Sequence, residues 1–285
     1  MKLEAGFIWH PRPLTVANAN VTRFMKAHGI ATREELHRRS VADVSWFWDA
    51  ALKDLGVEWY SPYRQVLDRS KGIEWASWFL GGKINIVHNC IDRHVGDKVA
   101  LIWEGDDGAT RTITYNELDW MIHRLANWLR MVGIRPGDAV GIYMPMVPEI
   151  VAAFFACLKV GAVAVPVFSA FAAPALAVRL ADAEAKVLFT ADGVSRRGKK
   201  TPLKPEADAA VAQVPSIRHV VVFERLGIEV PMTPGRDVWW SDLMSVKTHE
   251  APTEKLDAEA PSMILYTSGT TGKPKGTVHT HAGAL

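Results

Sequence analysis

The stretch Met263-Ile-Leu-Tyr-Thr-Ser-Gly-Thr-Thr-Gly-Lys-Pro-Lys-Gly276 joins an apolar run to a loop rich in glycine, hydroxyl and lysine side chains. The apolar part, Ser262 to Tyr266, has the length and composition of a buried strand. Glycines let the backbone turn sharply and bring its N–H groups close to an anion, while hydroxyls add donors and lysines neutralise charge. The sequence therefore predicts a strand that leads into a polyphosphate-binding loop.

This loop differs from the one found in P-loop ATPases and kinases, which requires G-x-x-x-x-G-K-[ST] with the lysine opening a helix. Here Gly269 and Gly272 are only three positions apart, and Pro274 follows Lys273. Proline has no N–H group and biases the preceding residue away from helical geometry. A P-loop enzyme, which would hydrolyse nucleotide independently of any carboxylate, is therefore disfavoured.

From Tyr266 to Gly276 the loop resembles the signature of the adenylate-forming, AMP-binding superfamily, which includes acyl-CoA synthetases and the adenylation domains of peptide synthetases. The resemblance implies that the loop holds the β- and γ-phosphates of ATP, with Mg²⁺ bridging the phosphates. The ATP-phosphate-binding residues that it implies are Thr267, Ser268, Gly269, Thr270, Thr271, Gly272, Lys273, Lys275 and Gly276.

Strand and helix signals alternate along the chain before this loop. A β-hairpin is expected over 99–115, followed by a helix that opens with the capping box Thr114 to Glu117. Short apolar strands and intervening helices follow, with strands expected at 139–143, 162–167, 186–190 and 219–223, and helices at 148–160, 174–183 and 205–214. This order predicts an α/β fold, a parallel sheet with helices on both faces and ligands at the carboxyl ends of its strands. Residues 227–257 are expected to be the least structured.

The residues before this sheet are rich in aromatic side chains and are predicted to be partly helical, with one helix from Asp43 to Leu55. Packing of these side chains against a larger domain is favoured over a ligand cage. Together with the stretches 81–85 and 89–94, the segment resembles the N-terminal cap of acetyl- and propionyl-CoA synthetases. Within it, Asp92, Arg93 and His94 are expected to be structural. We therefore divide the chain into an extension (1–31), a cap (32–92) and an AMP-binding domain truncated at its C-terminus (93–285).

A basic segment between Thr190 and Lys204 contains a cluster of cationic side chains, namely Arg196, Arg197, Lys199, Lys200 and Lys204. Charge alone leaves both a phosphate site and a solvated basic loop open. In acetyl-CoA synthetase-like enzymes a segment of this pattern contacts the 3′-phosphate of coenzyme A, and its two basic residues match Arg196 and Lys199. The family usually has arginine at the second position, and it commonly has glycines where this chain has Ser169 and Ala170.

The resemblance as a whole implies an AMP-forming acid–thiol ligase that converts a short-chain carboxylate, acetate- or propionate-like, to acyl-AMP and then to acyl-CoA. The family's catalytic residues follow the loop, so they are expected beyond residue 285. This predicts an amino-terminal fragment of a longer enzyme, inactive by itself. A carrier-protein-loading adenylation enzyme and a truncated, non-catalytic paralogue that binds a nucleotide or partner are the alternatives.

Composition also bears on the partners and the cellular location of the protein. The formal net charge of +2 gives no reason to expect nucleic acid as a partner. The two cysteines lack metal-ligand spacing, which favours a reducing, cytoplasmic location. The apolar run from Val151 to Phe171 is interrupted by Lys159, Gly161 and Pro166, so no membrane span is expected.

The pair His279 and His281 lacks a third ligand, so packing or capping is favoured over metal binding, and no metal site is predicted.

Overall fold

The computed structural model describes residues 9–247, 250–267, 272 and 274–285. The chain forms two compact units. One comprises Met1–Val57 with Gln65–Leu80, and the other comprises Glu58–Arg64 with Gly81–Leu285.

The smaller unit is mostly helical and is held together by aromatic side chains. The ring of Phe24 lies 6.4 Å from that of Trp46 and 6.0 Å from that of Phe47, and the guanidinium of Arg39 stacks on Trp46 at 3.6 Å. These side chains therefore pack against one another within the smaller unit. The elements of this unit are α1 (Pro13–Asn18), α2 (Asn20–Ala27), α3 (Arg33–Ala42), α4 (Val44–Asp54), the antiparallel strands β1 (Gln65–Asp68) and β2 (Ser77–Leu80), and a 3₁₀ turn at Ile73–Trp75.

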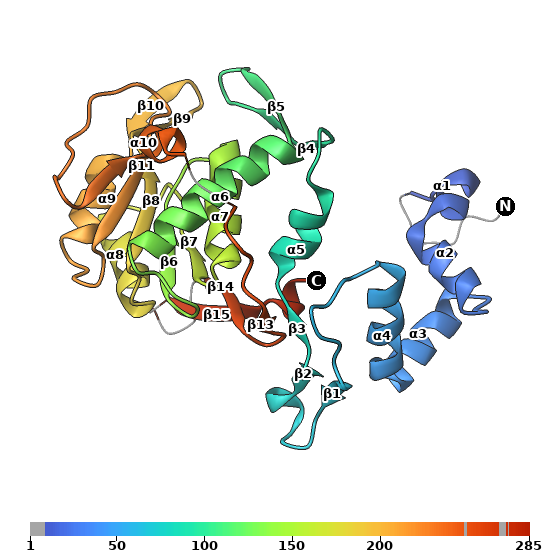
Figure 1. Cartoon of the computed structure of the whole chain (residues 1–285). Coiled ribbons are helices and arrows are strands. Elements are labelled where there is room, and N and C mark those ends of the chain that lie inside the picture. The colour runs from blue at the N-terminus through green and yellow to red at the C-terminus, as the bar shows by residue number, and fades with distance from the viewer. Residues whose placement is uncertain (1–8, 248–249, 268–271, 273) are drawn as a thin grey trace. The chain divides into compact units, whose positions relative to one another are not determined.

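The larger unit is built on a sheet of seven strands in the order β12-β11-β8-β6-β7-β14-β15 (Figure 1). The strands are β6 (Ala139–Ile142), β7 (Val163–Pro166), β8 (Val187–Ala191), β11 (His219–Phe223), β12 (Asp237–Trp239), β14 (Pro261–Thr267) and β15 (Lys275–Thr280). Neighbouring strands run parallel except for β14 and β15, which are antiparallel. The predicted parallel sheet is therefore confirmed with one antiparallel edge. Too few residues separate β14 from β15 for the crossover that a parallel pair requires.

Helices cover both faces of the centre of this sheet, where every residue of β6 and β8 is buried. Val140, Ile142 and Phe189 share one hydrophobic core, and Leu188 and Val220 belong to the other. The first core includes α6 (Tyr115–Met131), α7 (Pro148–Lys159) and α10 (Trp240–Ser245), and the second includes α8 (Ala173–Asp182) and α9 (Lys204–Val211). The chain passes from β6 to β7 on one side and then to β8 on the other, which creates a switch point at the carboxyl edge of β6.

Smaller elements complete this unit. The predicted hairpin is formed by β4 (Val99–Glu104) and β5 (Thr110–Thr114), and Thr114 and Glu117 form the predicted capping box of α6. The other elements are β3 (Lys83–Ile84), α5 (Ile86–Cys90), β9 (Gly193–Arg196), β10 (Lys199–Pro202), β13 (Leu256–Asp257) and 3₁₀ turns at Asp92–His94 and Ala282–Ala284.

One expectation needs correction. Residues 227–257 are not uniformly irregular, because β12 pairs with β11 and the side chains of Trp240 and Leu243 are buried in the core. No helix in the described residues is long and apolar enough to cross a membrane. The apolar run from Val151 to Phe171 is divided between α7, β7 and the loop that follows.

Candidate functional site

The described ends of the glycine-rich loop lie at the carboxyl edge of the sheet. Thr267 is the last residue of β14, which runs parallel to β7, and Lys275 is the first residue of β15. Thr267 and Lys275 are cross-strand partners, as are Tyr266 and Gly276. The loop therefore leaves and re-enters the sheet at the edge where ligands bind in open α/β sheets.

The strands at the base of this loop are packed closely. Tyr266 donates its phenol hydrogen to the Asp182 carboxylate at 2.6 Å, and burial together with this bond raises the pKa of Tyr266 above its usual value. A Cβ added to Gly276 would lie 2.8 Å from Cγ2 of Ile264. Gly272 has φ of 87°, in the left-handed region that favours glycine. The predicted residues Ser268, Gly269, Thr270, Thr271 and Lys273 lie outside the described part of the chain.

The basic segment after β8 forms the antiparallel hairpin β9–β10. Arg197 and Gly198 form its two-residue turn, with φ values of 51° and 74°. Arg196 and Lys199 flank this turn and are direct cross-strand partners, so their side chains project from the same face of the hairpin. Like charges placed opposite each other are destabilising unless an anion lies between them. Neither residue forms an ion pair with any described residue.

A cavity of about 290 Å³ lies beside this hairpin at the carboxyl edge of the sheet. Its wall combines the segments after β6, β7 and β8 with the β4–β5 hairpin. The guanidinium of Arg196 lies 5.8 Å from the ring centroid of Phe168, and Phe168 is 59% exposed. A neighbouring cavity of about 310 Å³ shares Arg196 and Ser169 and also includes Ala170. The first cavity therefore offers the Arg196 cation and an aromatic surface to a ligand, and Lys199 projects from the same face of the hairpin as Arg196.

Hydrogen bonds tie the β4–β5 hairpin to the cavity wall. The indole N–H of Trp103 donates to the carbonyl of Met146 at 2.7 Å. The N–H of Gly198 donates to the Asp106 carboxylate at 3.1 Å, and the Arg225 guanidinium donates to Asp107 at 2.9 Å. The N–H of Ala109 and the Arg225 guanidinium lower the pKa of Asp107. These hydrogen bonds of the β4–β5 hairpin could not be predicted from the sequence. No local pattern connects the turn at 106–107 to residues about a hundred positions later.

Comparison with known proteins identifies the family of this chain. Residues 88–285 match the family described as AMP-binding enzyme. The chain belongs to the AMP-binding enzyme family. Residues 33–90 match the acetyl-coenzyme A synthetase N-terminus, so the resemblance predicted from the loop and the aromatic cap is confirmed.

Several named AMP-binding enzymes are similar to this chain. It is 45% identical to an acetyl-coenzyme A synthetase of Methanothrix thermoacetophila over 93% of the chain and 40% of that protein. It is also 45% identical to one of Mycolicibacterium smegmatis, over 94% of the chain and 28% of that protein. A solved structure, the acetoacetyl-CoA synthetase from Streptomyces lividans, superposes with a TM-score of 0.89 at 32% identity, over 96% of this chain and 43% of that one. The chain thus spans less than half of the length of these relatives.

One member of the predicted basic cluster is not available to a ligand. Lys204 is fully buried and forms ion pairs with Asp208 and Asp237, both at 2.8 Å. The sequence could not distinguish it from its exposed neighbours, because charge density alone does not report burial. Within this AMP-binding chain, therefore, the basic surface of the hairpin consists of Arg196, Arg197, Lys199 and Lys200.

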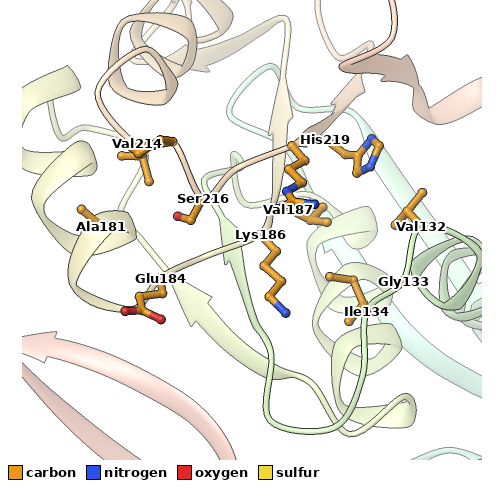
Figure 2. A pocket seen from close by; sticks show the side chains of 12 residues that line it. Val132, Gly133, Ile134, Ala181, Glu184, Lys186, Val187, Val214, Ser216 and His219 are labelled. Atoms are coloured by element: carbon orange, nitrogen blue, oxygen red, sulfur yellow. The ribbon is translucent and has the colours of Figure 1, made fainter.

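A larger cavity, of about 640 Å³, lies at the opposite edge of the sheet, where β8 and β11 begin (Figure 2). The C-terminal ends of α6, α8 and α9 approach it, and helix C-termini carry partial negative charge. Lys186, at this cavity, already forms an ion pair with Asp138. None of the sequence-predicted site residues lines it, so size alone does not make it the candidate site.

The two C-terminal histidines do not form a metal centre with other described residues. His281 is fully buried, and its Nδ1 accepts the N–H of Ile86 at 3.4 Å. Among the described residues, no group of three or more His, Cys, Asp or Glu side chains is placed to hold a metal ion. For His281 the structure supports the packing interpretation.

Proposed function

We propose that the protein containing this sequence is an AMP-forming acyl-CoA synthetase for a short-chain carboxylate such as acetate or propionate. In the first half-reaction a carboxylate oxygen attacks the α-phosphorus of ATP, and pyrophosphate leaves. In the second, the thiol sulfur of coenzyme A attacks the acyl carbonyl, AMP leaves, and the thiol proton is released. The protein would contribute mainly positioning and charge stabilisation to both steps.

The pairing of Arg196 with Lys199 is the observation that carries the coenzyme A part of this proposal. A phosphate monoester has the double negative charge and the acceptor oxygens that two adjacent cations can bind. Arginine would hold the 3′-phosphate with directional hydrogen bonds, and lysine would act as a point charge. The exposed ring of Phe168 beside Arg196 offers a surface on which the adenine can stack.

The ATP phosphates are assigned by this proposal to the glycine-rich loop, from Thr267 to Gly276. Because its described ends, Thr267 and Lys275, belong to two paired strands, the loop does not open a helix. Charge on the β- and γ-phosphates would then be neutralised by Lys273 and Lys275 rather than by a helix dipole.

Mg²⁺ fits the proposal as an ion that arrives with ATP. The described residues supply no preformed metal cage, and Mg²⁺ is commonly bound through substrate phosphates and only one or two protein ligands. Bound there, it would supply charge to the transferring phosphates. The proposal includes a cytoplasmic location, which both free cysteines, Cys90 and Cys157, favour.

A pair of charge reversals in the complete protein tests the coenzyme A assignment. Lys199 and Lys200 are adjacent on β10 and face opposite sides of the hairpin, and Lys200 has Ser195 as its partner. Lys199→Glu should raise the KM for coenzyme A by at least about tenfold, because it places a negative charge against the phosphate. Lys200→Glu makes the same change in net charge and should alter this KM by less than about threefold.

Carboxylate-dependent exchange of pyrophosphate into ATP, measured without coenzyme A, should be unaffected by both substitutions. Equal KM values for coenzyme A in the two variants would show that the hairpin does not bind the 3′-phosphate. ATP hydrolysis without any carboxylate dependence would exclude an acyl-CoA synthetase altogether. Acyl transfer to a carrier protein in preference to coenzyme A would favour the carrier-loading alternative.

A further inference from the structure

Two buried charged residues stand at the two stems of the β9–β10 hairpin. Asp192 directly precedes β9, and Lys204 comes two residues after β10. Both are 0% exposed, and neither lines the cavities beside Arg196. Burying a charge is costly unless it is fully hydrogen-bonded, so each residue must have a role in the fold of this region.

The Asp192 carboxylate is surrounded by backbone N–H groups. It accepts those of Gly193 at 2.6 Å, Arg225 at 2.8 Å, Leu226 at 3.0 Å and Ile228 at 3.2 Å. The first residue of the hairpin is thereby fixed to the loop that follows β11. Gly193 allows no side chain here, because an added Cβ would lie 2.8 Å from the carbonyl oxygen of Thr201.

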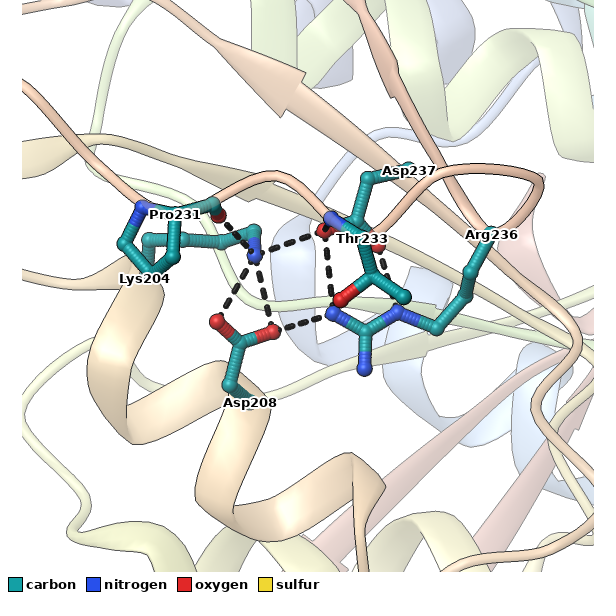
Figure 3. A network of polar contacts seen from close by, with 6 residues as sticks. All are labelled: Lys204, Asp208, Pro231, Thr233, Arg236 and Asp237. Atoms are coloured by element: carbon teal, nitrogen blue, oxygen red, sulfur yellow. Dashed lines mark hydrogen bonds and ion pairs between the residues drawn. The ribbon is translucent and has the colours of Figure 1, made fainter.

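The Lys204 ammonium fixes the other stem (Figure 3). It donates to both carboxylate oxygens of Asp208, to Asp237 and to the carbonyl of Pro231, at 2.8 to 2.9 Å. The Arg236 guanidinium bonds to the same two carboxylates, so the negative charges are balanced. This network connects the end of the hairpin to α9 and to β12 at the edge of the sheet.

The tip of the hairpin is fixed as well. The Gly198 N–H donates to Asp106, and Arg225 connects two anchors, since its backbone N–H binds Asp192 and its side chain binds Asp107. The hairpin is therefore held at both stems and at its turn before any ligand arrives. Arg196 and Lys199 repel each other, and the anchoring contacts compensate for this repulsion when the protein folds. Ligand binding therefore does not have to supply that free energy.

We propose that Asp192 is a positioning residue for coenzyme A, which sets the affinity for the 3′-phosphate by holding the β9–β10 hairpin in its binding geometry. This inference rests on the proposed function. Because Asp192 is buried and lines neither cavity beside Arg196, it would act through the placement of Arg196 and Lys199.

Asp192→Asn in the complete protein tests the inference. The substitution keeps the side-chain volume but turns an amide N–H₂ toward N–H donors, so the stem is expected to loosen. The KM for coenzyme A should rise by about tenfold, while carboxylate-dependent pyrophosphate exchange stays within about twofold. Electrostatics alone would act in the opposite direction, because removing a negative charge favours phosphate binding. A higher KM for coenzyme A would therefore indicate that the substitution has changed the geometry of the hairpin.

Asp138→Asn is the matched control, because Asp138 lies at the other edge of the sheet and pairs with Lys186. It should leave coenzyme A kinetics unchanged. If Asp192→Asn does not fold, Asp106→Asn at the exposed turn provides a second variant, which should raise the KM about threefold although it too removes a negative charge.

An unchanged or lower KM in the folded Asp192 and Asp106 variants would overturn the inference, and so would an equal loss of both half-reactions. Lys199→Glu separates this result from failure of the proposed function. If Lys199→Glu raises the KM and these variants do not, only the positioning role fails. If Lys199→Glu has no effect, the coenzyme A site itself is wrong.

Discussion

Lys159 and Asp92 form an ion pair of 2.8 Å in which the Lys159 side chain is only 3% exposed. The second carboxylate oxygen of Asp92 accepts the hydroxyl of Thr253 at 2.6 Å. The pair connects the segment after α5 to the C-terminal end of α7, where a cation also interacts favourably with the helix dipole. Asp92 therefore has the structural role that the sequence predicts for it.

Asp92→Asn should destabilise the protein strongly, because it leaves the buried ammonium of Lys159 without its counter-ion. We expect the free energy of unfolding to fall by about 3–5 kcal/mol, measured by urea denaturation. Lys83→Met is the control, since Lys83 and Asp257 are 44% and 55% exposed and their pair contributes at most about 1 kcal/mol. Equal losses in the two variants would contradict a special role for the buried pair.

Acid should destabilise the protein through His281. Burial lowers the pKa of His281 to about 4, from a usual value of 6.5. Above pH 6.5 the histidine is neutral in both states and its contribution to stability is fully present. Between pH 6.5 and 4 the unfolded chain binds a proton that the folded chain does not, so the free energy of unfolding falls by up to about 1.4 kcal/mol per pH unit.

His281→Gln should flatten this pH profile, because glutamine retains an acceptor for the Ile86 N–H but does not titrate in this range. The less buried His279 is the matched position, and His279→Gln should retain the acid dependence. The check is urea denaturation at several pH values between 4 and 7. Identical slopes for the wild type and His281→Gln would assign the acid dependence to other groups.

In the complete protein, Ser169→Gly should strengthen the proposed binding of coenzyme A. Ser169 lines both cavities beside Arg196, at a position where acetyl-CoA synthetase-like enzymes commonly have glycine. Removing its side chain would let the adenine approach the backbone more closely, and we expect the KM for coenzyme A to fall by about twofold to fivefold. Ser216→Gly, at the opposite edge of the sheet, should have no such effect. A higher KM in Ser169→Gly would indicate that the hydroxyl binds the ligand.

In the complete protein, Gly276→Ala should impair the proposed use of ATP rather than that of coenzyme A. The added methyl group would lie 2.8 Å from Cγ2 of Ile264 and 3.4 Å from the Tyr266 ring, so the base of the glycine-rich loop has to shift. We expect the KM for ATP in pyrophosphate exchange to rise by about fivefold, since small displacements of phosphate donors weaken binding markedly. Thr277→Ala, at the next position of β15, is the comparison. The prediction fails if both variants show normal ATP kinetics.

The sequence predicted the regular part of this fold well, because local patterns encode it. Apart from β9 and β10, the strands and helices from Val99 to Phe223 follow from hydrophobic period, capping residues and helix-starting prolines, and each lies close to its expected position. What local patterns could not provide was pairing between distant segments. The antiparallel edge formed by β15, the addition of β12 to the sheet and the folding of the basic segment into a hairpin all depend on tertiary contacts.

In the candidate site, too, some features follow from local sequence patterns and others depend on tertiary contacts. Arg196 and Lys199 were identified from their spacing, but their position opposite each other depends on the register of the hairpin. Lys204 was grouped with them by charge, although Asp208 and Asp237 keep it inside the protein. The hydrogen bond from Gly198 to Asp106 joins two turns far apart in sequence, and no pattern in either turn indicates the other.

The pairing of β14 with β7 has a consequence for the order in which the molecule assembles. Met263 lies beside Ala164, and the chain forms β8, β11 and β12 on the far side of the sheet before it returns to this edge. Contacts between residues so distant in sequence form slowly, because closing a long loop costs entropy before the contact stabilises the chain. For the proposed ATP site at this edge, we expect binding capacity to recover only with the slowest refolding phase, and recovery in an earlier phase would contradict this order. ATP binding would then distinguish fully folded chains from partly folded ones that already possess the remainder of the sheet.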